Sequence, residues 1–200
     1  MILLIIRHGE SEADILHVHE GRADYDLTSR GHRQAEAMAE YVRRNYTVDK
    51  LYSSTLKRAA STAAHLSDAL GVDICFDENL MEFNNGLIAG LPYDEAAEKY
   101  PRIMNLPVDQ SVYGQESLTE FRERAVQVLV RIRKECENKN TVAVVTPGGL
   151  INQLYGAALK MRVGADIHFP TGDTGIHIWE INDDGIRIIT SNLTVHADGI

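Results

Sequence analysis

Short apolar runs alternate along the chain with segments of helical periodicity. A strand buried in a parallel sheet has an almost unbroken apolar sequence, whereas an amphipathic helix places apolar residues three or four positions apart. The runs predict strands at Ile2–Ile6, Val48–Tyr52, Val72–Phe76, Thr141–Val145, Ile176–Ile181 and Ile186–Thr190. Between the last two lies Asn182-Asp183-Asp184-Gly185, a sequence typical of a hairpin turn.

The periodic segments predict helices over residues 34–41, from about 58 to 70, from 117 to about 136, and over 148–160. Gly71 is a natural end for the second helix. Ser117 is the expected N-cap of the third, and Glu120, three residues later, completes a capping box.

The alternation of strands and helices predicts an α/β fold with three layers, in which a mostly parallel sheet carries helices on both faces. The chain has 200 residues and shows no internal repeat, low-complexity tract or linker-like change of composition. This length suits a single domain, residues 1–200, with a substantial buried core.

Composition and charge exclude several functional classes. The apolar share is 44% and the charged share 24%, which are ordinary values for a soluble globular protein. The net charge of −9 argues against nucleic-acid and anionic-membrane partners, so an anionic ligand requires a local cluster of arginines. The only cysteines, Cys75 and Cys136, have no metal-ligand spacing and predict free thiols in a reducing compartment. The sequence also shows no signal peptide and no membrane-spanning run, so we expect a cytoplasmic protein.

The polar segments that follow the strands hold the candidate chemistry. They are Arg7-His8-Gly9-Glu10-Ser11, Ser53-Ser54-Thr55-Leu56-Lys57-Arg58, Leu80-Met81-Glu82 and Thr146-Pro147-Gly148-Gly149. Ligands of such sheets bind at the carboxyl ends of the strands, so these segments are expected to meet at one edge. Taken singly, each has a simpler explanation as a solvated loop, a surface cation or a strand-to-helix turn.

Together these segments resemble the histidine phosphatase superfamily, in the branch that contains phosphoglycerate mutases and many small phosphatases. The resemblance covers nearly the whole chain. It rests on the R-H-G-E-S sequence at Arg7–Ser11, on Gly21-Arg22-Ala23-Asp24, on the S-S-x-L-x-R-A-x-x-T-A block from Ser53 to Ala63, on Leu80 and Glu82, and on Gly114–Ser117. It implies a fold similar to that of phosphoglycerate mutase.

The resemblance implies that His8 is the nucleophile and forms a phosphohistidine. Arg7 and Arg58 would bind the phosphoryl oxygens, and Glu82 would be the general acid. It also implies phosphate or substrate contacts from Asp14, Gly21 and Gly148, with no metal and no cofactor.

Three positions depart from the pattern of the family, and one of them, Ala89 where a glutamate often precedes Gly90, is more often structural than catalytic. Pro147 stands where the family usually has a second histidine that donates to the phosphoryl group, and proline has no such donor. Asp14 stands where asparagine is frequent, and its carboxylate would repel an anionic substrate. His17 and His19 could replace the missing histidine, although solvated loop residues are the simpler interpretation.

The expected function is a phosphomonoesterase, weakened or disabled by Pro147, that acts on a small phosphorylated substrate. The alternatives are a non-catalytic descendant that binds phosphate or a partner, and a phosphoglycerate mutase. The expected cap, roughly residues 83–116, lacks the long basic insertion suited to a bisphosphate, which favours a phosphatase. An apolar lining for the leaving group could come from Tyr93, Tyr100, Met104 and Tyr113, which could equally pack the cap onto the core. A homodimer could form through an edge strand near the Asn182 hairpin.

Overall fold

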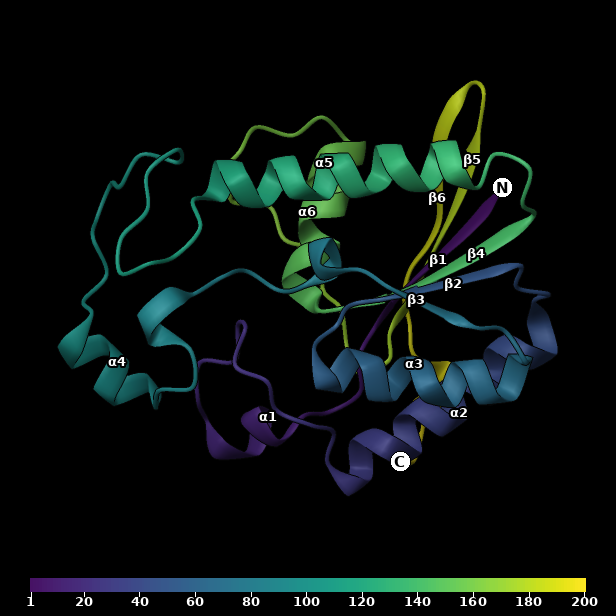
Figure 1. The fold of residues 1–200 in the computed structure, drawn as a ribbon, viewed down its shortest axis with the longest axis horizontal. Coiled ribbons are helices and arrows are strands. Elements are labelled where there is room, and N and C mark those ends of the chain that lie inside the picture. The colour runs from purple at the N-terminus through teal and green to yellow at the C-terminus, as the bar shows by residue number, and fades with distance from the viewer.

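The computed structural model describes residues 1–200 and consists of one six-stranded sheet with helices on both faces (Figure 1). The strands are β1 (Ile2–Arg7), β2 (Lys50–Ser53), β3 (Ile74–Phe76), β4 (Thr141–Thr146), β5 (Ile176–Asn182) and β6 (Gly185–Leu193). The α-helices are α1 (Glu12–Leu16), α2 (Ser29–Asn45), α3 (Lys57–Leu70), α4 (Tyr93–Lys99), α5 (Leu118–Glu135) and α6 (Gly148–Ala158). Three short 3₁₀ turns complete the fold, at Glu78–Leu80, Gly86–Ile88 and Val195–Ala197.

The sheet has the strand order β3-β2-β4-β1-β5-β6. The first four strands in this order are parallel, whereas β5 runs antiparallel to β1 and β6 antiparallel to β5. The predicted α/β fold with a mostly parallel sheet is therefore confirmed, with an antiparallel pair added at one side. The hairpin predicted at Asn182–Gly185 joins that pair.

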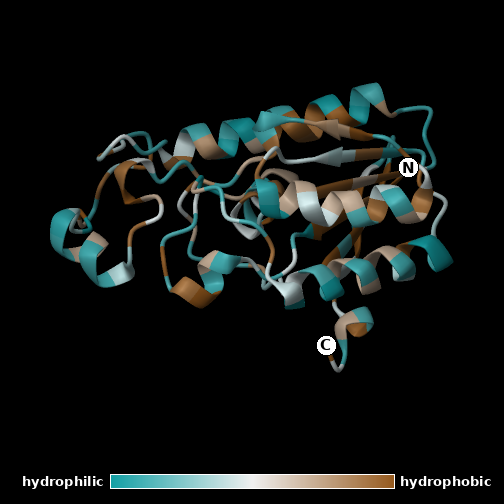
Figure 2. Ribbon diagram, turned by 60° about the horizontal axis from the view of Figure 1, so that its bottom comes forward, coloured by the Kyte–Doolittle hydropathy of each residue, from teal (hydrophilic) through white to brown (hydrophobic).

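Alternate residues of each strand pack toward opposite layers. One hydrophobic cluster includes Leu3 and Ile5 of β1 and packs under α5 and α6. The other includes Leu4 and Ile6 and packs under α2 and α3. Figure 2 shows the strands in the apolar colour between helices that present polar residues outward. This burial on both faces explains why β1 has an unbroken apolar sequence.

The local signals at the helix ends agree with the structure. Gly71 ends α3 in the left-handed conformation, and Ser117 caps α5 in a capping box with Glu120. The predicted strand over 72–76 is shorter, because β3 lies at the edge and pairs only through residues 74–76. The predicted helix over 148–160 ends at Ala158, and helices α1 and α4 were not expected.

The segment between Glu82 and α5 lies beside the carboxyl ends of the parallel strands, away from the α2–α3 layer (Figure 1). It contains α4 and the long connection from Tyr100 to Ser117. The cap that the sequence suggests over residues 83–116 occupies this position, and its separate status stays a prediction. No helix is long and apolar enough to cross a membrane.

Candidate active site

The carboxyl ends of β1, β2 and β4 meet at one edge of the sheet, where the four polar segments also come together. In the pairing of β1 with β4, Arg7 lies opposite Thr146, so His8 and Pro147 both leave the sheet at the same level. The backbone N–H of Ser54, just after β2, donates to Val145 O. The edge predicted from the strand pattern is therefore the place where the candidate residues gather.

His8 is buried, and its two ring nitrogens have different partners. Nδ1 lies 2.7 Å from the carbonyl oxygen of Gly9, which can only accept, so Nδ1 carries the hydrogen. Nε2 is then the unprotonated nitrogen, and Nε of Arg58 donates to it over 3.2 Å. Burial, followed by the positive charges of Arg58 and Arg7, lowers the pKa of His8 well below its usual range. His8 is thus a neutral imidazole with a fixed tautomer.

The backbone around His8 is held by close contacts. Gly9 N–H donates to Oγ1 of Thr62 over 3.1 Å, which ties the loop to α3. A Cβ at position 9 would lie 2.5 Å from the carbonyl oxygen of Gly31, so only glycine allows the loop to approach the start of α2 this closely.

Arg58 lies in the first turn of α3 and is fully buried. Its Nη1 and Nη2 donate to the carbonyl oxygens of Ala23 and Gly21, at 3.1 and 2.8 Å. These bonds fix the guanidinium plane so that Nε points toward His8. Gly21 therefore contacts Arg58 through its carbonyl oxygen, and its own contact with the phosphate stays a prediction.

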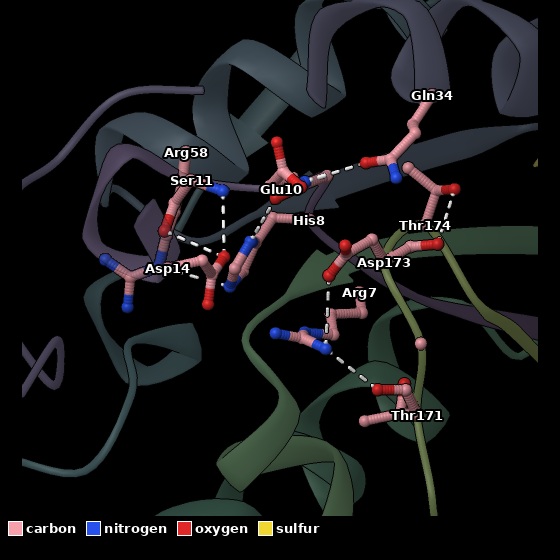
Figure 3. Close-up of polar contacts among 12 residues, drawn as sticks. Arg7, His8, Glu10, Ser11, Asp14, Gln34, Arg58, Thr171, Asp173 and Thr174 are labelled. Carbon is pink, nitrogen blue, oxygen red and sulfur yellow. Dashed lines mark hydrogen bonds and ion pairs between the residues drawn. The ribbon is translucent and has the colours of Figure 1, made fainter. Parts of the chain in front are cut away.

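The guanidinium of Arg7 extends to the same side as the His8 ring and reaches Asp173 and Thr171 in the loop before β5 (Figure 3). Its Nη1 donates to Thr171 O over 2.9 Å and lies 3.2 Å from Oδ1 of Asp173. Its Nε is buried and has no hydrogen-bond partner. A buried donor of this kind is costly unless a ligand or a water completes it, so the Nε–H of Arg7 is an unpaired donor at this edge.

Glu82 is held against the beginning of α6. One carboxylate oxygen accepts from Gly149 N–H over 2.8 Å, and the other accepts from Phe83 N–H over 2.7 Å. A Cβ at position 149 would overlap the Glu82 carboxylate, so the approach requires glycine. The expected general acid is thus fixed at a helix N-terminus.

Pro147 is the N-cap of α6, with φ of −69°, and makes no side-chain cap bond. It fits the helix start without strain, because this φ is the one that proline prefers. Gly148 follows it, and a Cβ there would lie 3.7 Å from Cδ of Arg7. The structure therefore brings Gly148 next to Arg7 at the same edge as His8.

Asp14 serves a local structural purpose in α1. Its Oδ2 accepts from the backbone N–H of Ser11 over 2.9 Å, as the second half of a capping box, and lies 3.2 Å from the hydroxyl oxygen of Ser11 (Figure 3). The residue is otherwise exposed. His17 and His19 lie beyond α1, where His17 is exposed and the ring of His19 packs against Tyr93.

Comparison with known proteins decides the family. The profile of the Histidine phosphatase superfamily (branch 1) matches residues 3–194. The chain belongs to the histidine phosphatase superfamily. Within it, the chain is 29% identical to Phosphoserine phosphatase 1 of Hydrogenobacter thermophilus, over 97% of this chain and 93% of that one. It is 32% identical to Phosphoglycerate mutase-like protein 4 of Arabidopsis thaliana, over 78% of this chain and 70% of that one.

The fold also agrees with solved structures. Bacillus stearothermophilus YhfR superposes with a TM-score of 0.87, at 22% identity, over 98% of both chains. The resemblance to this superfamily and to the phosphoglycerate mutase fold is therefore confirmed, and the relatives are phosphatases and mutase-like proteins. The chain is a phosphatase-type enzyme of this superfamily.

Two carboxylates of this histidine phosphatase site were missed from the sequence. Oε2 of Glu20 lies 3.2 Å from Nε of Arg58 and 3.9 Å from Nε2 of His8. Asp173 pairs with Arg7. Burial raises the pKa of both carboxyls, and this outweighs the lowering effect of the neighbouring arginines.

The reason for each omission is topological. The sequence predicts site residues directly after parallel strands, but β5 runs antiparallel, so the residue that reaches the same edge precedes β5. Asp173 is such a residue. Glu20 belongs to the irregular loop between α1 and α2. The resemblance places this loop at the site through Gly21, but nothing in the sequence singles out Glu20 itself. A reading that includes the residues before an antiparallel strand would have found Asp173.

A cavity of about 640 Å³ lies under the segment between Glu82 and α5. Its lining includes His19, Phe83 and Glu116, and 13 of its 22 residues are hydrophobic. The four residues proposed from sequence as an apolar lining all border it: Tyr93, Tyr100, Met104 and Tyr113. Met104 is 73% exposed and Tyr93 53% exposed, so these two do not pack the segment onto the core.

Proposed function

We propose that this histidine phosphatase hydrolyses a small phosphomonoester through a phosphohistidine formed on Nε2 of His8. The observation that carries the proposal is the state of the ring: Nδ1–H is bound to Gly9 O, and Nε2 is unprotonated beside Arg58. A nucleophilic imidazole needs this arrangement. The lowered pKa of His8 supports it, because the ring stays neutral at physiological pH.

In the first step, Nε2 of His8 bonds to phosphorus as the bond from phosphorus to the ester oxygen breaks. The positive charges of Arg58 and Arg7 beside His8 neutralise the charge on the transferring oxygens. Glu82 gives its proton to the departing alcohol oxygen. In the second step Glu82 takes a proton from water, the water oxygen bonds to phosphorus, and inorganic phosphate leaves as Nε2 is released.

Pro147 lies beside His8 at this edge and offers no hydrogen-bond donor from its side chain or its nitrogen. We propose that this weakens catalysis. One missing donor of this kind costs about 2.7–4 kcal/mol of transition-state stabilisation, or about 10²–10³ in rate. In this proposal Gly21 holds Arg58 in position and Asp14 holds Ser11. Gly148, at the start of α6, lies beside Arg7 and so next to the phosphoryl group.

The cavity favours a phosphatase over a mutase. Its lining is mostly apolar and contains a single arginine, Arg102, while Lys99 lies outside the lining and is paired with Glu95. A second phosphate would find few free cations there, whereas an alcohol with an apolar body would fit. The proposed partner is therefore a small phosphorylated molecule. The homodimer through β6 and the cytoplasmic setting stay predictions.

The test is hydrolysis of p-nitrophenyl phosphate by the native chain, Pro147→His and His8→Ala. The proposal expects turnover from the native chain that His8→Ala abolishes, and an increase of about 10²–10³ in Pro147→His. If His8→Ala turns over as fast as the native chain, the catalytic proposal is wrong. If no variant turns over while inorganic phosphate still binds, the non-catalytic phosphate-binding alternative is favoured.

A further inference from the structure

The anion site contains a carboxylate at the place where a phosphoryl oxygen would bind. Oε2 of Glu20 lies within 3.2 Å of the Nε–H of Arg58, the same N–H that points at Nε2 of His8. It is also 3.9 Å from that nitrogen. A phosphoryl group attacked by Nε2 and held by Arg58 would bring an oxygen next to the same carboxylate.

The surroundings of Glu20 determine how it responds to an anion. Arg58 from α3 and Arg7 from the end of β1 face it with positive charge, and Asp14 from α1 faces it with negative charge. Neutral His8 lies beneath, and the Ser11 hydroxyl donates to the other carboxylate oxygen, Oε1. With Oε1 occupied in this way, Oε2 is the oxygen left to face a ligand.

We propose that Glu20 is a phosphoryl-contact residue, which takes up a proton when the anion binds and then donates that hydrogen to a phosphoryl oxygen. The proton comes from solvent and adds to Oε2, so no other bond changes. In its ionised form Glu20 pairs with Arg58 and repels the incoming anion. This inference rests on the proposed function for its role in turnover, but not for its role in anion binding.

Burial supports the proposal, because it already raises the pKa of Glu20 despite the arginines nearby. An anion placed next to the carboxylate raises it further. A carboxylic acid kept neutral in this way can donate a hydrogen bond. Anion affinity should therefore weaken as pH rises, by up to about tenfold for each pH unit over the range in which free Glu20 is ionised. Over the same range the protein should take up about one proton for each anion that binds.

The test uses sulfate, because it keeps the same charge from about pH 5 to about pH 8, so that a change in affinity reports on the protein. Titration calorimetry in buffers of different ionisation enthalpy gives both the affinity and the number of protons taken up. The variants are Glu20→Gln, Asp173→Asn and the matched control Glu12→Gln, an exposed carboxylate of α1 with the same change of charge.

We expect Glu20→Gln to bind sulfate at least about tenfold more tightly than the native chain near pH 8, with a flat pH profile and no proton uptake. Glu12→Gln should keep the native profile. If Glu20→Gln retains the native affinity and slope, or if Asp173→Asn alone abolishes the slope, the proposal is overturned.

The result separates this inference from the proposed function. A flattened profile in Glu20→Gln without any phosphohistidine in the native chain upholds the role of Glu20 and contradicts the catalytic mechanism. If the native chain forms a phosphohistidine but Glu20→Gln leaves sulfate binding unchanged, the catalytic mechanism is upheld and the role of Glu20 is contradicted. Turnover of Glu20→Gln over the same pH range adds a second readout, since a purely structural role would leave its pH profile unchanged.

Discussion

Gly149 allows Glu82 to be displaced without changing any residue that touches the substrate. Gly149 N–H donates to the Glu82 carboxylate, and a Cβ at position 149 would overlap Oε1 and lie 2.7 Å from Cδ. The overlapping atoms are the end of a flexible side chain, so Gly149→Ala should rotate Glu82 away while the backbone stays in place. The bond from Phe83 N–H is too local to hold the carboxylate in its present position.

The expected loss can be worked from that contact. The Glu82 carboxyl becomes charged as it gives up its proton, and a hydrogen bond to a charged group contributes about 1.5–3 kcal/mol. If Glu82 acts as the general acid only when so held, kcat/KM should fall by about 10- to 150-fold. Folding stability should change little, because alanine favours a helix over glycine by up to about 1 kcal/mol and offsets part of the lost bond. Gly149→Ala is therefore expected to lower turnover while leaving the thermal unfolding temperature nearly unchanged.

The assay compares two leaving groups in a double-mutant cycle. An alkyl phosphate needs leaving-group protonation, whereas p-nitrophenolate leaves without much help, so Gly149→Ala should affect the alkyl ester more. In a Glu82→Gln background the same substitution should cost little, because the group it displaces no longer acts. If Gly149→Ala lowers kcat/KM by the same factor in both backgrounds, or by the same factor for both substrates, Glu82 does not act through this contact.

Two further predictions concern stability and the cavity. Burial lowers the pKa of His177 to about 4, so the folded state keeps the ring neutral while the unfolded chain binds a proton below about pH 6.5. The free energy of unfolding, measured by urea titration, should therefore drop by about 2–3 kcal/mol between pH 7 and pH 4.5, and by less in His177→Gln. An equal drop in both proteins would show that the pKa of His177 is not lowered in the folded state. Met104→Ala should raise KM for aryl phosphates several-fold while the free energy of unfolding changes by less than about 0.5 kcal/mol. The exposed control Ile189→Ala should change neither quantity, and an unchanged KM in Met104→Ala would show that Met104 does not contact the substrate.

The sequence predicted the layers well because the burial pattern of this fold is simple. Strand β1 is buried on both faces and has a continuous apolar sequence, and the cap residues Gly71 and Ser117 mark helix ends with local chemistry. Helix α1 has only five residues and therefore too few turns to show a period. The direction of β5 was not predicted either, since an apolar run does not indicate whether a strand is parallel.

The site was predicted to the extent that its residues follow parallel strands. His8 and Arg7 follow β1 directly, and Arg58 comes in the first turn of the helix after β2. Glu20 and Asp173 were missed because their places depend on a loop that folds back and on an antiparallel neighbour. Such contacts arise only from tertiary structure. They also change the picture of the site, since each of its two arginines has an acidic partner.

In the proposed mechanism His8 accepts the phosphoryl group on Nε2. The most direct test incubates the chain with a phosphorylated substrate, quenches it in alkali to preserve phosphohistidine, and locates the phosphoryl group by mass spectrometry and phosphorus NMR. We expect an acid-labile phosphoryl group on His8 alone, attached to Nε2, because the hydrogen on Nδ1 is bound to Gly9 O. We also expect no label in His8→Ala. A phosphoryl group on another residue, on Nδ1, or on no residue during measurable turnover would contradict this mechanism.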